Sequence, residues 1–120
     1  MSVKITRLSE AEEKIILGGP IRMVFTPETA NTKNFLFAIG YFKPGEGLKA
    51  HLHPESEEVY YVTEGTGTVY LGKEREEVQI EPEMAIYIPP GLIHQVKNTG
   101  KENLVICFFV APGKEESVEV

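Results

Sequence analysis

Turn-forming residues interrupt this sequence at short intervals, which limits the chain to short secondary-structure elements. After residue 18, glycine, proline and asparagine separate apolar segments of three to eight residues. Short segments of this kind, with turns every 8–12 residues, are typical of an all-β sandwich or barrel. No helical stretch of 10–15 residues lies between them, which argues against a parallel α/β fold. We predict about nine strands, at residues 21–25, 35–42, 48–53, 58–63, 66–71, 78–80, 85–88, 93–97 and 104–110.

The chain has 120 residues, which is the size of one domain. Near its start, Ser9 and Glu12 have the spacing of a capping box, and this predicts one or two helical turns over residues 10–17. The Gly-Gly-Pro sequence that follows would end them. We therefore expect an N-terminal extension, a β-barrel and a C-terminal tail, at residues 1–20, 21–113 and 114–120.

Composition excludes several classes of protein. Cys107 is the only cysteine, so a disulfide framework, a zinc finger and an iron–sulfur site are all excluded. All 18 acidic residues are glutamate, and they outnumber the 12 lysines and arginines. Without a basic stripe, a nucleic acid is not an expected partner. No apolar run approaches the roughly 18 residues of a membrane span, and the charged N-terminus does not resemble a signal peptide, so we expect a cytoplasmic protein.

The three histidines of the chain occur in a pattern that suits a metal ion. His51 and His53 are two residues apart on a predicted strand, so both side chains project from the same face. Glu58 starts the next strand, and His94 follows a Pro-Pro-Gly turn. Three imidazoles and one carboxylate suit divalent Mn, Fe, Ni, Cu or Zn. With four protein ligands, an octahedral ion keeps two positions open for water, substrate or dioxygen.

Two segments around these residues resemble the two motifs of the cupin superfamily. The first motif is glycine, five residues, His-x-His, three or four residues, glutamate, six residues and glycine, and residues 45–65 match it. The second is Pro-x-Gly-x-x-His-x-x-x-Asn, which residues 89–98 match. One departure is Glu83, which stands where a glycine usually opens the second motif. Because it lies in a turn, we expect it to change the local backbone and not the ligands.

The resemblance implies a small single-domain cupin (a monocupin), which is an all-β jelly-roll barrel or double-stranded β-helix. The capping signal adds a short N-terminal helical turn to this expectation. It also implies metal ligands at His51, His53, Glu58 and His94. Glu58 is preferred over its neighbour Glu57 because it fits the six-residue gap to the following glycine. Glu57 is the alternative ligand.

Three further residues are candidates for positioning a substrate or transferring a proton, because no histidine remains free for this work. Lys49 is expected on the same strand face as His51; alternatively it is a solvated lysine at a strand end. Arg22 lies in an apolar strand, where it either faces water or binds a carboxylate or phosphate. Tyr60 either faces the cavity or is a core residue with a satisfied hydroxyl.

The apolar strand at residues 104–110 has no polar alternation, so both of its faces are expected to be covered. One cover is the barrel core, and the other is a second subunit, in keeping with the dimers common among cupins. Cys107 lies within this strand, and its apolar surroundings predict an inert packing residue with a raised pKa.

Function does not follow from fold, and the cupins include dioxygenases, decarboxylases, isomerases and proteins without catalysis. Our first hypothesis is a metal-dependent enzyme of dioxygenase, decarboxylase or isomerase type that acts on a small organic molecule. The alternative is a small-molecule or metal-binding module without turnover. The alternative would gain support if Lys49, Arg22 and Tyr60 all faced solvent.

Overall fold

Antiparallel pairing joins the strands into two sheets in the computed structural model, which describes residues 3–114 and 117–120. The larger sheet has the order β1 (Glu12–Ile16), β2 (Gly19–Phe25), β3 (Leu36–Phe42), β10 (Leu104–Ala111), β5 (Glu57–Glu64) and β8 (Ala85–Ile88). The smaller sheet has the order β11 (Val118–Glu119), β4 (Gly47–Leu52), β9 (His94–Lys97), β6 (Gly67–Leu71) and β7 (Glu76–Ile80).

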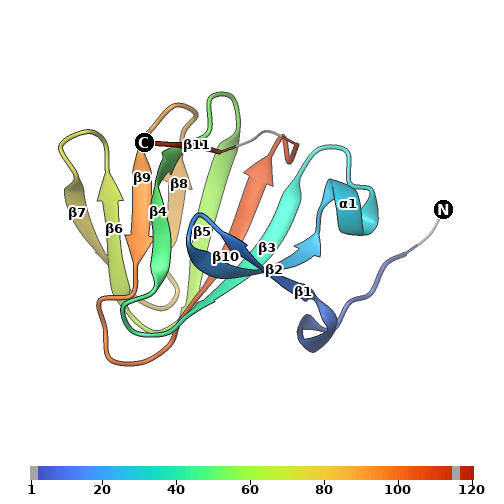
Figure 1. Cartoon of the computed structure of the whole chain (residues 1–120), viewed down its shortest axis with the longest axis horizontal. Coiled ribbons are helices and arrows are strands. Elements are labelled where there is room, and N and C mark those ends of the chain that lie inside the picture. Colours follow the sequence, from blue (N-terminus) through green and yellow to red (C-terminus); the bar gives the residue numbers. More distant parts are fainter. Residues whose placement is uncertain (1–2, 115–116) are drawn as a thin grey trace.

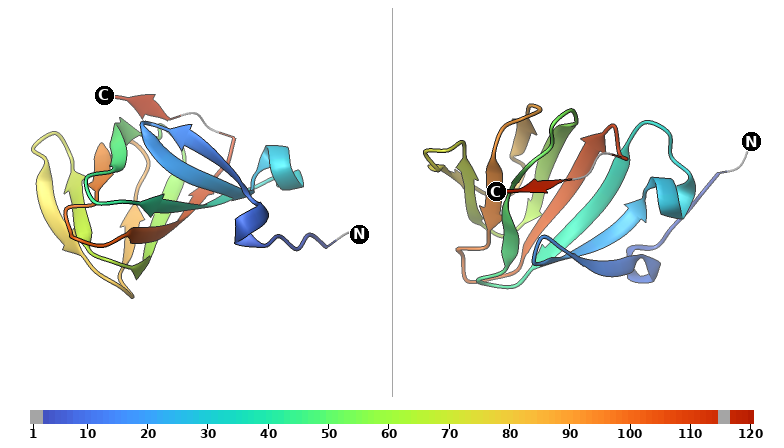
Figure 2. Two further views of the ribbon diagram at one scale, coloured as in Figure 1. Left: turned by 60° about the horizontal axis from the view of Figure 1, so that its bottom comes forward. Right: turned by 45° about the horizontal axis from the view of Figure 1, so that its top comes forward.

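From β3 onward the chain crosses from one sheet to the other at nearly every connection, and only the β6–β7 hairpin stays within one sheet. The two sheets therefore face each other across one core (Figures 1 and 2). Fully buried side chains fill the space between them, among them Phe42, Val62, Val69, Leu104 and Ile106. The predicted all-β jelly roll is confirmed.

The N-terminal part differs from the prediction. The expected helical turn is present as a 3-10 turn at Leu8–Glu10, but the predicted range was wrong, because residues 12–16 form strand β1. Leu17 and Gly18 have φ values of 50° and 85° and make the two-residue turn that joins β1 to β2. Such a turn matches the twist of a hairpin, and pairing with β2 outweighs the local helical preference.

Other differences are smaller. The segment between the first two predicted strands contains a short helix, α1 (Pro27–Ala30), which Thr26 caps by accepting hydrogen bonds from the backbone N–H groups of Glu28 and Thr29. Strand β11 was not predicted, because two exposed residues carry no alternation to reveal it. No helix in the described part of the chain is long and apolar enough to cross a membrane.

Asn98 connects the end of β9 to the end of β3. Its side-chain nitrogen donates to the carbonyl oxygens of Phe42 (2.8 Å) and Glu102 (2.7 Å), and its side-chain oxygen accepts from the N–H of Gly100 (2.9 Å). The residue is only 1% exposed. Water therefore cannot easily replace these three bonds, and the asparagine of the second motif has a structural role here.

We expect Asn98→Ala to lower the free energy of unfolding by about 2–3 kcal/mol, because it leaves buried backbone groups without partners. Asn103→Ala, at an exposed position five residues away, should stay within about 0.5 kcal/mol of the wild type. Urea denaturation of both variants measures the difference. Equal losses in the two variants would contradict the structural role of Asn98.

Candidate metal centre

A bulge in β4 determines which of its side chains point into the barrel. Leu48 and His51 are three residues apart, yet both are buried. The register with β9 shifts between them, so that Lys49 and Ala50 together oppose one residue of β9. The extra residue reverses the usual alternation and turns His51 inward.

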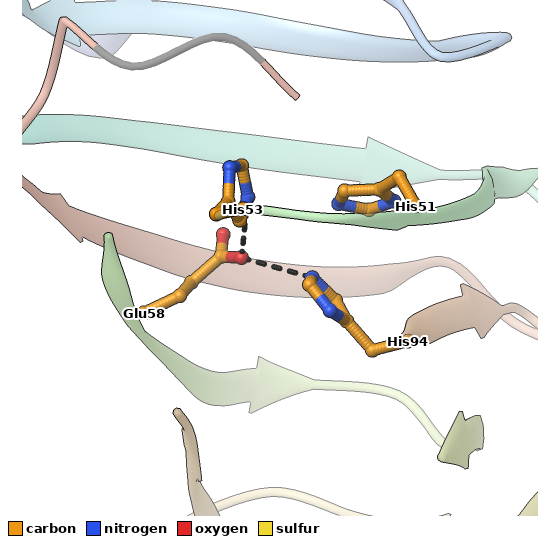
Figure 3. Close-up of side chains that lie close together, drawn as sticks. All are labelled: His51, His53, Glu58 and His94. Atoms are coloured by element: carbon orange, nitrogen blue, oxygen red, sulfur yellow. Dashed lines mark hydrogen bonds and ion pairs between the residues drawn. The ribbon is translucent and has the colours of Figure 1, made fainter. Parts of the chain in front are cut away.

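Four side chains from different parts of the sequence point toward one another inside the barrel (Figure 3). His51 comes from β4, His53 from the segment after it, Glu58 from β5 and His94 from β9. One potential ligand atom from each residue lies within 4.8 Å of the others, and all four residues are buried. These are the four residues that the sequence motifs predicted together.

Backbone carbonyls hold two of the imidazoles in place. Nδ1 of His51 donates to the carbonyl oxygen of Lys49 (2.7 Å), and Nδ1 of His94 donates to that of Leu92 (2.9 Å). A carbonyl oxygen can only accept, so the proton of each neutral ring is on Nδ1. The Nε2 lone pairs are left available, which is the arrangement of a histidine that binds a metal ion.

The contacts of Glu58 show that the cluster suits a cation. Its Oε1 atom lies 3.1 Å from Nε2 of His53 and 3.1 Å from Nε2 of His94. In the neutral His94 ring the proton is on Nδ1, so Nε2 is an acceptor, and so is Oε1 of Glu58. These two acceptors would face each other unless a proton or a metal ion lies beside them. Neighbouring ligand atoms in an octahedron with bonds of about 2.1 Å are roughly 3 Å apart. The donor set and its spacing therefore fit a divalent ion.

Burial controls the charge of the cluster. It lowers the pKa of His51 from 6.5 to about 4, and the nearby His94 adds to this effect. Burial alone would raise the pKa of Glu58, but the adjacent imidazoles of His53 and His94 outweigh it, so the pKa lies below its usual value. At neutral pH, His51 is an uncharged ligand and Glu58 is a carboxylate.

The structure also distinguishes the two adjacent glutamates. Glu57 is exposed and accepts a hydrogen bond from the hydroxyl of Tyr87 (2.7 Å), on the outer side of the sheet. Consecutive residues of a strand point to opposite faces, so Glu58, which follows the outward-facing Glu57, faces the interior. Glu57, the alternative that the sequence left open, lies outside the cluster.

Lys49 and Arg22 do not reach the site, contrary to the positioning roles considered from the sequence. Lys49 is exposed, because the β4 bulge turns it away from the face of His51. Arg22 alternates with Ile21 and Met23, which line the interior cavity, and so it projects from the opposite face. There its guanidinium donates to the carbonyl oxygen of Leu8 (3.1 Å).

Tyr60 is fully buried next to the cluster. Its ring packs against Phe108 at 4.7 Å and against His94 at 5.9 Å between centroids. Among the described residues its hydroxyl has no hydrogen-bond partner, and burial raises its pKa well above the usual value. Tyr60 does not line the interior cavity. Its clearest contribution is to support the His94 ring.

An apolar cavity of about 190 Å³ lies beside the cluster and is lined by His51, His53 and Glu58 at one end. The β1–β2 hairpin forms one of its walls through Ile16 and Met23. Ile16 was not predicted as a lining residue, because residues 10–17 were expected to be helical. The carbonyl groups that orient the imidazoles were missed as well, since backbone contacts leave no signal in the residue types.

Comparison with known proteins agrees with this geometry. The family described as Cupin domain matches residues 38–111, which contain all four residues of the cluster. The chain belongs to the cupin family. The resemblance inferred from the two motifs is confirmed.

Among curated cupin relatives, the polyketide synthase CurC of Streptomyces cyaneus is 30% identical over 112 residues, which cover 93% of this chain and 71% of the relative. The solved structure of the polyketide cyclase RemF from Streptomyces resistomycificus has a TM-score of 0.83 and 21% identity, covering 99% of this chain and 86% of that one. A predicted oxalate decarboxylase from Thermotoga maritima has a TM-score of 0.78 and 23% identity, covering 90% and 98%. The two structures support the cupin fold.

The low pKa of His51 predicts that the metal-free cupin loses stability in mild acid. The folded protein keeps His51 neutral down to about pH 4, whereas the unfolded chain protonates it near pH 6.5. As the pH falls through this window, the unfolded state binds the proton first, so the free energy of unfolding decreases. We expect a loss of about 2 kcal/mol between pH 7 and pH 5, measured by urea denaturation in the presence of a chelator.

His51→Gln serves as the control, because it removes this titrating group. Its free energy of unfolding should change less than that of the wild type between pH 7 and pH 5. The same pH dependence in both proteins would show that His51 is not responsible.

Proposed function

We propose that this cupin binds one divalent transition-metal ion through His51, His53, Glu58 and His94. The observation that carries the proposal is the approach of Oε1 of Glu58 to two imidazole nitrogens at 3.1 Å in a buried site. A buried carboxylate next to oriented lone pairs is costly without a cation. The ligand types suit Mn, Fe, Ni, Cu or Zn.

We further propose that the protein is a metal-dependent enzyme that acts on a small organic molecule, of dioxygenase, decarboxylase or isomerase type. The metal would supply Lewis-acid or redox chemistry at its open positions. The chain itself supplies the rest: three imidazoles held in fixed orientations, a carboxylate, and an apolar wall that excludes water from the bound molecule. The curated relative CurC, whose name describes a polyketide synthase, supports an organic substrate.

The second candidate is a binding module without turnover. It is supported by the position of the other candidate residues, since Lys49 and Arg22 project away from the cavity and Tyr60 is buried outside its lining. Among the described lining residues, no acid–base side chain remains besides the cluster itself. Any turnover would then depend on the metal and its ligands alone.

Elemental analysis of untagged protein tests the metal centre. We expect about one equivalent of metal in the wild type and a loss of at least tenfold in affinity in Glu58→Gln, because the variant lacks the anionic ligand. Glu57→Gln is the matched control, and it should keep its metal. Equal metal content in all three proteins would contradict the proposed ligand set.

The same three proteins distinguish the enzyme from the binding module. Protein loaded with Mn or Fe is incubated in air with a hundredfold excess of small hydroxy and keto compounds. The products are analysed by mass spectrometry after chromatography that separates isomers. An enzyme converts many equivalents in the wild type and in Glu57→Gln but not in Glu58→Gln. Saturable binding without product would favour the binding module.

We also propose that the protein is a homodimer that pairs through the outer face of the six-stranded sheet. Neither β3 nor β10 contains a charged residue, although the chain carries a net charge of −6. Phe109 and Tyr61 on this face are 45% and 39% exposed, and Phe109 stacks on Phe37 at 4.7 Å. Two negatively charged copies repel each other least where the uncharged strands β3 and β10 of one copy meet those of the other.

The dimer proposal predicts that Phe109→Glu shifts the protein toward the monomer of 13.4 kDa. A buried carboxylate at the centre of the interface should weaken association by more than tenfold. Val118→Glu is the control, because Val118 is equally exposed at 45% but lies on the other sheet. Sedimentation at several concentrations measures both variants, and a monomeric wild type would contradict the proposal.

A further inference from the structure

The interior cavity has two chemically different ends. His51, His53 and Glu58 line one end, and the surrounding walls are apolar side chains from the β1–β2 hairpin, β3, β4 and β10, among them Ile16, Ile21, Met23, Leu36, Phe108 and Val110. Exposed Ser117 marks a point where the cavity reaches the surface. A molecule inside would meet polar ligand atoms at one end and hydrocarbon over the rest of its surface.

No cationic side chain lines this cavity among the described residues. The nearest candidates from the sequence, Lys49 and Arg22, project outward for the reasons given above. Lys14 and Lys114 line an adjoining pocket that shares Ile16, Met23, Leu36 and Gly113 with the cavity, and there Lys14 is 3.5 Å from Glu12 and 3.4 Å from Glu28. A negative charge held against the apolar side chains of the cavity itself would therefore lose its hydration without gaining a partner there.

The volume limits how much of a molecule the cavity can enclose. An apolar cavity of roughly 150 Å³ in a protein interior is large enough to bind benzene. The cavity of this cupin, at about 190 Å³, has room for about one ring and its substituents. A molecule of several fused rings could place only a part of itself inside.

We infer that the ligand of this site is a compact molecule of about one ring, with a single metal-chelating group at one end and an uncharged apolar body. The inference rests on the proposed metal centre and specifies the substrate class of that same site. It excludes phosphorylated sugars bound to the metal at one end, because their phosphate would lie against the apolar walls. It also excludes a polycyclic compound as a fully enclosed ligand.

Two hydroxamic acids test this inference, because they share the same chelating group and differ in the body. Benzohydroxamic acid carries a phenyl ring, and acetohydroxamic acid carries a methyl group. We expect zinc-loaded protein to bind benzohydroxamic acid at least tenfold more tightly, since only the ring can bury its surface against the apolar walls. A carboxylate at the para position of the ring should remove this advantage. Isothermal titration measures the three affinities.

Ala38→Leu provides the matching variant, because Ala38 lines the cavity and is 2% exposed. The larger side chain should reduce the preference for the ring to below threefold while the zinc content is unchanged. Ala85→Leu, the same substitution at an exposed strand position, should retain the preference. If Ala38→Leu does not fold, Val110→Phe fills the cavity from β10 instead.

The outcomes separate the two proposals. The inference is overturned if the zinc-loaded wild type does not prefer benzohydroxamic acid, or if Ala38→Leu keeps that preference. Either result leaves the proposed metal centre intact. If the wild type binds no metal, the proposed function fails, and toluene binding to the metal-free protein tests the cavity alone. Saturable chemical-shift changes with toluene that are lost in Ala38→Leu would support the inference of an apolar ligand. If the wild type shows no such changes, that inference is overturned.

Discussion

The structure depends on one electrostatic constraint, which is a carboxylate buried among three imidazoles. Glu58 is 5% exposed, and its Oε1 atom lies 3.1 Å from two ring nitrogens. An ionised group in such a place requires a nearby positive charge, from a proton or from a metal ion. The β4 bulge, the carbonyl groups that orient His51 and His94, and the packing of Tyr60 against His94 all serve to hold the ligand atoms in this arrangement.

The polar and apolar parts of the interior follow from the same backbone. Strand alternation and the bulge send the charged side chains of Lys49 and Arg22 outward, so that among the described residues the cluster supplies the ionisable groups of the cavity lining. A metal ion at this position would be the single reactive group facing a hydrocarbon wall. Chemistry and selectivity would then have separate sources: the ion with its ligands for the reaction, and the shape of the apolar cavity for the choice of molecule.

The sequence predicted more of the site than of its surroundings. The four clustered residues could be chosen because their types are rare in this chain and their spacing matches two motifs, and the strands from β2 to β10 could be located because turn residues bound them. Lys49 was misplaced because simple alternation does not anticipate a bulge. Residues 12–16 were expected to be helical because the capping signal is local, whereas β1 is stabilised by its partner strand.

The sequence by itself determined the all-β architecture, the cupin family and the identity of the clustered residues, since these depend on residue types and on spacing along the chain. Only the tertiary structure decided which glutamate faces inward, which cations face outward, and how the β1–β2 hairpin closes an apolar cavity beside the cluster. These features depend on register and on contacts between residues far apart in the chain. A shift of one residue in a strand reverses the face of every side chain that follows, and the local sequence does not predict such a shift.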